Sequence, residues 1–349
     1  QIGINGNDIG GLQMAGVEVS GAGNELFEHG VQFVNLHGTA AVADSSFRNN
    51  LYRQFTVQNS TGNLSLAVSN SLFTSSGLAS GAQGMLISGH GTATIDVSVT
   101  GSTFSNNLAA GYFSDGADMA ALDVRIAGSQ FMNNGGGVAL AIANGASLAY
   151  DIGSNTLTGS RSPAVSIFKG SLSSGPASGT VRGNTIGTAG VPGSACGSGP
   201  CEAISLTANG VGDYAATVTG NEIRNFRTRA IGASMAEDVT ANLTIDANTI
   251  AEPAPGAGSS IFVQSGTLPG HTSSVCSSIQ GNVISGSYAT GILVRNRFPS
   301  TTFRLPGYSG GDTDTTAVAA YLAAQNGGAL ATATTNGNAF GGGAACPTP

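Results

Sequence analysis

A short phrase recurs along most of this chain, and it constrains the fold more than any other feature. The phrase is an apolar residue, any residue, glycine, asparagine or serine, any residue, and a second apolar residue. It reads VTGSTF at 99–104, VTGNEI at 218–223 and IQGNVI at 279–284. Self-similarity at a period of roughly 20 to 50 residues is the signature of a repeat architecture, in which each unit buries its apolar side against its neighbours. The phrase therefore predicts a solenoid.

Aligning the phrases predicts which positions stack on one another. We call the last apolar residue of each phrase its anchor; most anchors lie 26 to 37 residues apart. The predicted anchors are Ile9, Leu26, Phe47, Phe73, Phe104, Phe131, Leu157, Ile186, Ile223, Ile250, Ile284 and Phe340. The residues five positions before the anchor are Val68, Val99, Ile126, Ile152, Val181, Val218, Ile245 and Ile279. Because β-branched residues pack well on a pleated surface, we expect this column and the anchors to be buried.

A polar column lies two positions before the anchors. Its members are Ser71, Ser102, Ser129, Asn155, Asn184, Asn221, Asn248 and Asn282. Side chains of this kind hydrogen-bond neighbouring backbone at turns, and stacked coils would let them bond to one another. We expect a ladder of asparagines at a turn inside each coil.

A second strand is expected after a loop in each coil, for example at 84–87, 137–140 and 291–294, where the sequence shows strand-like alternation. With its ladder, the pattern resembles the right-handed parallel β-helix repeats of the pectate-lyase-like superfamily, over nearly the whole chain to about residue 300. The tail, 335–346, resembles the ends of large secreted bacterial repeat proteins. We predict an all-β protein, a right-handed parallel β-helix with a short C-terminal capping helix.

Two regions are expected. Residues 1–300 would form the coils, as the C-terminal part of a longer solenoid or as a processed mature chain, and 301–349 would form a cap with one helix and a final strand. An alanine- and leucine-rich run at 317–327 predicts the helix. Asp312 and Asp314 precede it. We interpret them as caps of the helix N-terminus, and the alternative is a calcium loop, because their D-x-D spacing occurs in such loops.

Composition limits the partners and the compartment. The formal net charge is −7 and Lys169 is the single lysine, which argues against a nucleic-acid partner. The chain has no run of 18 apolar residues, so we expect no membrane insertion. Four cysteines favour disulfides and an oxidising, extracellular or cell-surface location. Cys196 and Cys201 flank a tight turn and should pair; by elimination, Cys276 should pair with Cys346.

One charged cluster follows from the register. Asp96 and Asp123 align eight positions before their anchors, and Arg125 aligns with Asp151 of the next coil. Enzymes of the superfamily that the chain resembles use outward carboxylates, arginine or lysine, and sometimes calcium. The cluster could therefore cut a glycosidic bond or hold calcium beside a uronate. We favour the other interpretation, a solvated ladder of ions in which Arg125 offsets the acids.

Other charged residues form no common column. The arginines in question are Arg224, Arg227, Arg229, Arg295 and Arg297, which gather in two coils separated by one. They could face an acidic glycan, but because their offsets from the anchors differ, we interpret them as scattered over loops. The four histidines, His29, His37, His90 and His271, share no register, and the residues 115–118 are typical of a turn. No Ser-His-Asp order, phosphate loop or metal motif is present.

We therefore expect a non-catalytic extracellular module of a bacterial surface or secreted protein, stalk-like or adhesin-like. It would have no cofactor, and its partners would be a glycan or cell-surface ligand and the upstream part of the same polypeptide. The alternative is a polysaccharide lyase or glycoside hydrolase that acts on an acidic glycan through Asp96, Asp123 and Arg125. A phage-type tailspike is a third hypothesis. A cleft over the acids would favour an enzyme, and a flat face would favour a stalk.

Overall fold

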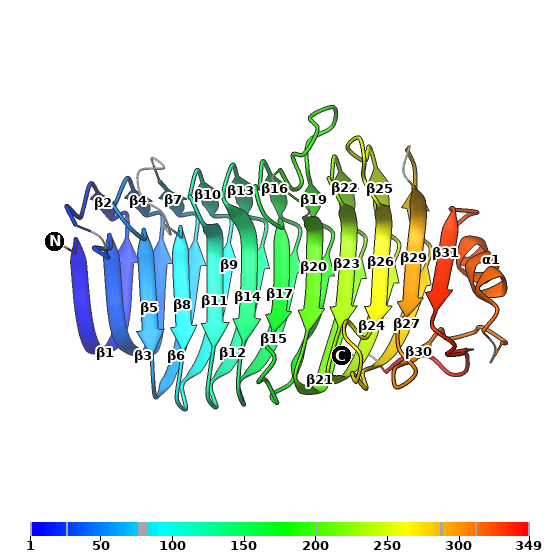
Figure 1. The fold of residues 1–349 in the computed structure, drawn as a ribbon. Helices are drawn as coiled ribbons and strands as arrows, with labels where there is room; N and C mark the ends of the chain where they lie inside the picture. Colours follow the sequence, from blue (N-terminus) through cyan, green and yellow to red (C-terminus); the bar gives the residue numbers. More distant parts are fainter. Residues whose placement is uncertain are drawn as a thin grey trace.

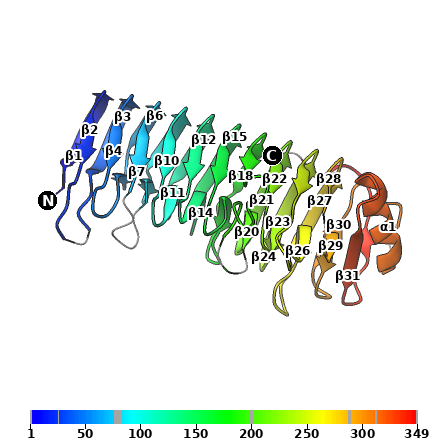
Figure 2. The same ribbon diagram turned by 90° about the horizontal axis from the view of Figure 1, so that it is seen from above.

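The chain winds into a single elongated stack of parallel coils. The computed structural model describes residues 2–347 except 26, 76–82, 198, 200, 287–288 and 311–312. Every strand pairing within that part is parallel and joins one coil to the next. Figures 1 and 2 show the coils side by side along one axis, with the N-terminus at one end and the only helix of the described chain at the other. The fold is an all-β parallel β-solenoid, as predicted.

Each full coil contributes strands to three faces, which we call A, B and C. Face A holds β5 (Phe55–Asn59), β8 (Met85–Gly89), β11 (Ala110–Gly116), β14 (Gly136–Ile142), β17 (Val165–Lys169), β20 (Glu202–Ala208), β23 (Arg229–Met235), β26 (Ser259–Ser265), β29 (Thr290–Asn296) and β31 (Ala331–Thr335). Face B holds β6 (Asn63–Ser69), β9 (Thr94–Thr100), β12 (Ala121–Ala127), β15 (Ser147–Gly153), β18 (Ala177–Arg182), β21 (Val211–Thr219), β24 (Asp238–Asp246), β27 (Ser274–Gln280), β30 (Thr302–Arg304) and β32 (Phe340–Gly341).

Face C is a separate sheet of short strands, one from each coil. Its strands are β2 (Glu18–Ser20), β4 (Ser46–Arg48), β7 (Leu72–Thr74), β10 (Thr103–Ser105), β13 (Gln130–Met132), β16 (Thr156–Thr158), β19 (Thr185–Ile186), β22 (Glu222–Arg224), β25 (Thr249–Ala251) and β28 (Val283–Ile284). At the N-terminal end, β1 (Ile4–Ala15) and β3 (Val31–Ala43) run through both face A and face B, which joins these two faces into one continuous sheet.

The anchors stack on face C, with three exceptions. Each anchor from Phe47 to Ile284 pairs with the next in register, and the column five positions before is buried throughout. The predictions for Ile9 and Phe340 are wrong: Ile9 lies in β1, opposite Leu36, and Phe340 pairs with Phe303 on face B. Leu26 lies outside the described residues, and Val19 of β2 takes the anchor position of its coil.

The ladder at the turn between faces B and C is formed as predicted. The Asn221 side chain accepts from the backbone N–H of Asn184 at 3.0 Å and donates to the carbonyl oxygen of Val181 at 2.9 Å. The backbone N–H of Asn221 in turn donates to the side chain of Asn248 at 3.0 Å. The ladder residues are buried, so water cannot satisfy these turn amides. Each coil therefore depends on a side chain of the next coil to satisfy its turn.

The ladder residue and the anchor of a coil compensate each other in size. Where the ladder residue is serine the anchor is phenylalanine, as in Ser102 and Phe104; where it is asparagine the anchor is leucine or isoleucine, as in Asn221 and Ile223. The four phenylalanines stack nearly parallel, and Phe104 and Phe131 lie 4.8 Å apart between ring centroids at an interplanar angle of 2°. Because the interior is close-packed, a small turn residue must be matched by a large anchor.

Helix α1 (Thr315–Gln325) covers the C-terminal end of the solenoid. The Asp314 carboxylate accepts from the backbone N–H groups of Thr316 and Ala317 at 2.9 and 3.2 Å, so the helix begins two residues earlier than predicted. Asp314 therefore acts as a cap, and Asp312 lies outside the described residues. Past the helix, the Asn326 side chain accepts from the backbone N–H of Asn282 at 3.1 Å. The helix thus supplies the last rung of the ladder.

A disulfide fixes the C-terminal tail across face B. Cys276 of β27 pairs with Cys346, as predicted, with 5.6 Å between their Cα atoms. The tail lies over the sheet as far as Pro347, which lines a cavity of about 620 Å³ together with Thr240 and Asn242 of β24. The disulfide closes a chain segment with a sequence separation of 70 residues.

Replacing Asn221 with alanine should lower the free energy of unfolding by about 1–3 kcal/mol, because it leaves the buried N–H of Asn184 and the carbonyl of Val181 without partners. Urea unfolding followed by circular dichroism measures the change. Asn63→Ala is the control, since Asn63 is exposed at the start of β6. Equal effects of the two substitutions would contradict the role given to the ladder.

Removing the Cys276–Cys346 disulfide by a double serine substitution should destabilise the C-terminal coils by up to about 4 kcal/mol, the chain-entropy value for so long a loop. Removing Cys196–Cys201, whose sequence separation is 5, should cost about half as much. Hydrogen exchange resolved along the chain measures both. The expectation fails if amides in β29 and β31 exchange at the same rate with and without Cys276–Cys346.

Candidate functional site

The predicted acidic column forms on face B. Asp96 and Asp123 are direct partners across β9 and β12, and Arg125 is the partner of Asp151 across β12 and β15. The register prediction is therefore correct for all four residues. Their side chains point outward, away from the buried valines and isoleucines of the same strands.

Arginines neutralise this column. Arg125 lies 3.1 Å from Asp96 and also bonds to Asp123, while Arg182 forms a two-point contact with Asp151 at 2.7 and 2.9 Å. Sequence reasoning missed Arg182, because it stands at the end of β18 opposite Gly153 rather than opposite the aspartate that it contacts. These side chains are 38–54% exposed. Exposed ion pairs of this kind contribute roughly 0–1 kcal/mol each to the free energy of unfolding. The geometry of the column is therefore that of a solvent-exposed ladder of ion pairs.

Asp123 has a modestly unusual environment within the ladder. Partial burial is the main influence and raises its pKa; Arg125 lowers the pKa, and the like charge of Asp96 raises it again. Arg125 contacts the carboxylates of both Asp96 and Asp123, so each acid is already paired within the protein.

A groove lies on face A instead. One cavity of about 500 Å³ is lined by small residues of β11, β14 and β17, such as Ala110 and Ser166, and by loop residues that include Leu108 and Arg161. A second cavity of about 350 Å³ is lined by residues of β20 and β23 and of the loops that precede them. Both cavities are also lined by Ser162 and Pro163, so they adjoin. Together they form one groove across five strands, which we call the face A groove.

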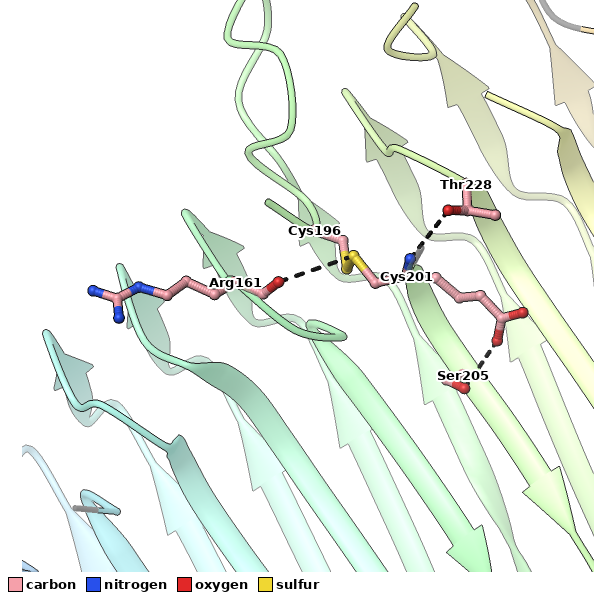
Figure 3. The surroundings of a disulfide bond; sticks show 6 residues. Arg161, Cys196, Cys201, Ser205 and Thr228 are labelled. Atoms are coloured by element: carbon pink, nitrogen blue, oxygen red, sulfur yellow. Dashed lines mark hydrogen bonds between the residues drawn. A yellow bond between two sulfur atoms is a disulfide. The ribbon is translucent and has the colours of Figure 1, made fainter. Parts of the chain in front are cut away.

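A disulfide-bonded loop forms one wall of the face A groove. Cys196 and Cys201 are paired as predicted, in the long connection between β19 and β20, with 6.1 Å between their Cα atoms. Figure 3 shows how this loop is attached: the backbone N–H of Cys201 donates to the Thr228 hydroxyl at 3.0 Å, and the Cys201 sulfur lies 4.0 Å from the carbonyl oxygen of Arg161. The loop is thus fixed to the coils on both sides of it.

Glu202 follows the disulfide directly and faces the groove. Its carboxylate accepts from the Ser205 hydroxyl at 2.9 Å and pairs with Arg229 of the next coil. Both charged side chains are mostly buried, with 17% of Glu202 and 26% of Arg229 exposed. Gly232 lies beneath the Glu202 carboxylate, and a Cβ atom there would force that side chain to move. Glycine at this position thus makes room for the mostly buried ion pair.

Two of the arginines that we interpreted as scattered converge on face A. The Arg229 guanidinium lies 3.7 Å from the centroid of the Phe262 ring, and the Arg295 guanidinium lies 5.3 Å from the same centroid. We name this cluster the Arg–Phe–Arg cluster. The interpretation as residues scattered over loops holds for Arg227, which lines a different cavity, whereas Arg224 lies in β22 and pairs with Glu222 and Glu252. For Arg229 and Arg295 it is wrong.

Buried polar groups occupy the N-terminal part of face A. Asp115 lies in β11 rather than in the expected turn, as the partner of Ser88 in β8. Burial raises the pKa of Asp115, against the opposing effects of Ser88, His90 and Arg53. The Ser88 oxygen lies 3.0 Å from His90, so serine stands between histidine and aspartate. In hydrolases histidine stands in the middle, so this group lacks the order needed to activate a serine.

The comparisons with known proteins identify no relative: no family model, no curated protein and no solved structure matches this chain. In the part of the chain that the structure describes, no helix is long and apolar enough to cross a membrane. Nor do three His, Cys, Asp or Glu side chains gather anywhere among the described residues in a group that could hold a metal ion.

His29 provides a pH-dependent test of face A. Burial, and secondarily Arg53, lowers the pKa of His29 to about 4, below its ordinary value of 6.5. As pH falls through 6.5 towards 4, the unfolded chain takes up a proton that the folded chain resists, so stability is lost in that window, by up to about 3 kcal/mol. Urea unfolding at pH 7.5 and 4.5 should show a smaller pH effect in His29→Gln than in the wild type. The exposed His90, changed to glutamine, is the control, and an unchanged pH effect in His29→Gln would refute the assignment.

Proposed function

We propose that this protein is a non-catalytic extracellular module of a bacterial surface or secreted protein, stalk-like or adhesin-like, that binds a glycan in the face A groove. The observation that carries the proposal is the groove itself. It crosses five neighbouring strands about 4.8 Å apart, so it is roughly 20 Å long. A groove of that length along the axis suits an extended chain of several sugars.

The lining of the groove suits a carbohydrate. Hydroxyl groups of Ser162, Ser166 and Ser205 offer donors and acceptors to sugar hydroxyls. Phe168 does not line the groove, but it lies two residues after Ser166 in β17, on the same outward side of the strand, and is 43% exposed. An exposed aromatic ring beside hydroxyl groups is a suitable platform for the apolar face of a pyranose ring. The rigid, disulfide-fixed wall lowers the entropy lost on binding.

The stalk-like part of the proposal rests on the regularity of the coils. Each coil hydrogen-bonds to both neighbours, and the buried ladder ties their turns together. The stability of such an array is approximately the sum of the stabilities of the single coils and of the interfaces between neighbouring coils. A solenoid can therefore become longer without needing a wider hydrophobic core. The two disulfides are consistent with an oxidising compartment.

The enzymatic alternative would use Asp96, Asp123 and Arg125. We prefer the non-catalytic function, because Arg125 offsets both of these acids and because the face A groove lies on another face of the solenoid. A sugar on face B would have to displace Arg125 before either carboxylate could act on it.

A glycan array with the whole chain, followed by calorimetry with the glycans retained, tests the proposal. Ser166→Trp should block the groove and lower the affinity at least tenfold. Ser178→Trp, the same change at an outward position of β18 on face B, should leave the affinity unchanged. Retention of no glycan, or equal binding by both variants, would refute glycan binding in the groove.

A reducing-end assay on the same glycans tests the absence of catalysis. The wild type should release no reducing ends, and Asp96→Asn with Asp123→Asn should retain glycan binding, because these residues lie outside the groove. Depolymerising activity that disappears in the double variant would establish the lyase or hydrolase function instead.

A further inference from the structure

The C-terminal part of face A carries positive charge that the described protein does not balance. A cavity of about 260 Å³ is lined by Arg295 of β29 and by Arg297, which directly follows that strand. The other lining residues are threonines and asparagines. Thr334, Thr335 and Asn336 come from β31 and the residue after it. No carboxylate lines this cavity. Two guanidinium groups with hydroxyl and amide groups around them form a typical surrounding for an oxyanion.

Only some of the protein's arginines contact a carboxylate. Arg48, Arg125 and Arg182 each contact one, whereas Arg53 and Arg304 donate to Gln83 and to the Cys276 sulfur instead. Among the described residues, neither Arg295 nor Arg297 forms an ion pair. Burial lowers the pKa of Arg295, and the two charges that lower it further, those of Arg229 and Arg297, are both positive. Folding therefore holds three like charges together with one carboxylate, Glu202, beside them.

Aromatic rings hold Arg295 and Arg297, which have no carboxylate partner among the described residues. Arg229 covers the Phe262 ring at 3.7 Å, and Arg295 approaches it at 5.3 Å, which gives each a cation–π contact. The ring is 2% exposed, so these guanidinium groups shield it from solvent. Arg297 stands at 5.3 Å from the Phe298 ring in the same way. Aromatic rings thus orient Arg295 and Arg297 and leave their N–H donors available to a ligand, whereas Arg229 donates to Glu202.

We propose that Arg295 and Arg297, supported by the Arg–Phe–Arg cluster, form a site for the oxyanion group of an acidic saccharide, a carboxylate or a sulfate. The site deepens the proposed function and rests on it for the saccharide. β29 lies two strands beyond β23, where the face A groove ends. A glycan lying in the groove along the axis reaches the site at its C-terminal end, and the two planar guanidinium groups can each bind the oxyanion through paired N–H donors.

Calorimetry with four probes tests the site: heparin fragments, polygalacturonate, neutral dextran and inorganic sulfate. The wild type should bind heparin or polygalacturonate more tightly than dextran, and added salt should weaken this binding. Arg295→Ala with Arg297→Ala should lower the affinity for the acidic polymer by about ten- to a hundredfold, the effect of losing charge-assisted hydrogen bonds. Arg182→Ala removes an arginine on face B and should change nothing.

The outcomes separate this site from the proposed function. Preference for heparin over polygalacturonate identifies sulfate as the group bound, and the reverse identifies carboxylate. The inference is overturned if the wild type binds neither acidic polymer, if the double variant binds them as well as the wild type does, or if sulfate alone binds as tightly as the polymers. If the wild type binds dextran and Ser166→Trp does not, the proposed glycan binding in the face A groove is still supported.

Circular dichroism confirms that the variants fold. Arg295→Lys should bind the acidic polymer with intermediate affinity, since lysine keeps the positive charge but lacks the planar guanidinium group.

Discussion

The hydrogen bond from each turn amide to the ladder side chain of the next coil is the constraint on which the rest of this structure depends. The turn between faces B and C is buried, so its N–H groups must find partners inside the protein. Asn184, Asn221 and Asn248 supply those partners one coil ahead. This fixes the register of every coil at one corner, whatever its length. The connection between β19 and β20 can therefore be long and disulfide-bonded without disturbing the strands on either side.

The same constraint shapes the core and the end of the solenoid. A serine rung leaves space that a phenylalanine anchor fills, whereas an asparagine rung is accompanied by a smaller anchor, so polar and apolar columns are chosen together. The last rung cannot come from another coil of the described chain, and Asn326 at the end of α1 provides it. The helix thus covers the apolar end and also completes the ladder. A helix without an acceptor at this position would leave the turn amide of Asn282 unpaired.

The fold could be predicted from the sequence because buried columns repeat with the coil, and both disulfides followed from spacing and elimination. Ile9 and Phe340 were assigned to the wrong face because the repeated six-residue phrase also occurs in strands outside face C. Only the strand pairing shows to which face each copy of the phrase belongs. The Arg–Phe–Arg cluster was missed for another reason. Arg229 and Arg295 lie at different positions along strands that are two coils apart. Aligning the repeats predicts only which Cα atoms stack, so it cannot predict that two long side chains from different positions meet at the same aromatic ring.

The distribution of charge distinguishes the faces of the solenoid. On face B, every aspartate of the ladder lies against an arginine, while Asp238 and Asp246 of β24 accept from threonine hydroxyls instead. On face A, one glutamate stands beside three arginines in a chain whose formal net charge is −7. With 19 acidic residues available, pairing Arg295 and Arg297 with carboxylates would have been simple, and their mutual repulsion opposes folding. Cation–π contacts of about 0.5–2 kcal/mol orient the arginines but do not neutralise them. Among the described residues no carboxylate neutralises Arg295 and Arg297, and this imbalance is the reason for proposing an anionic partner at the C-terminal part of face A.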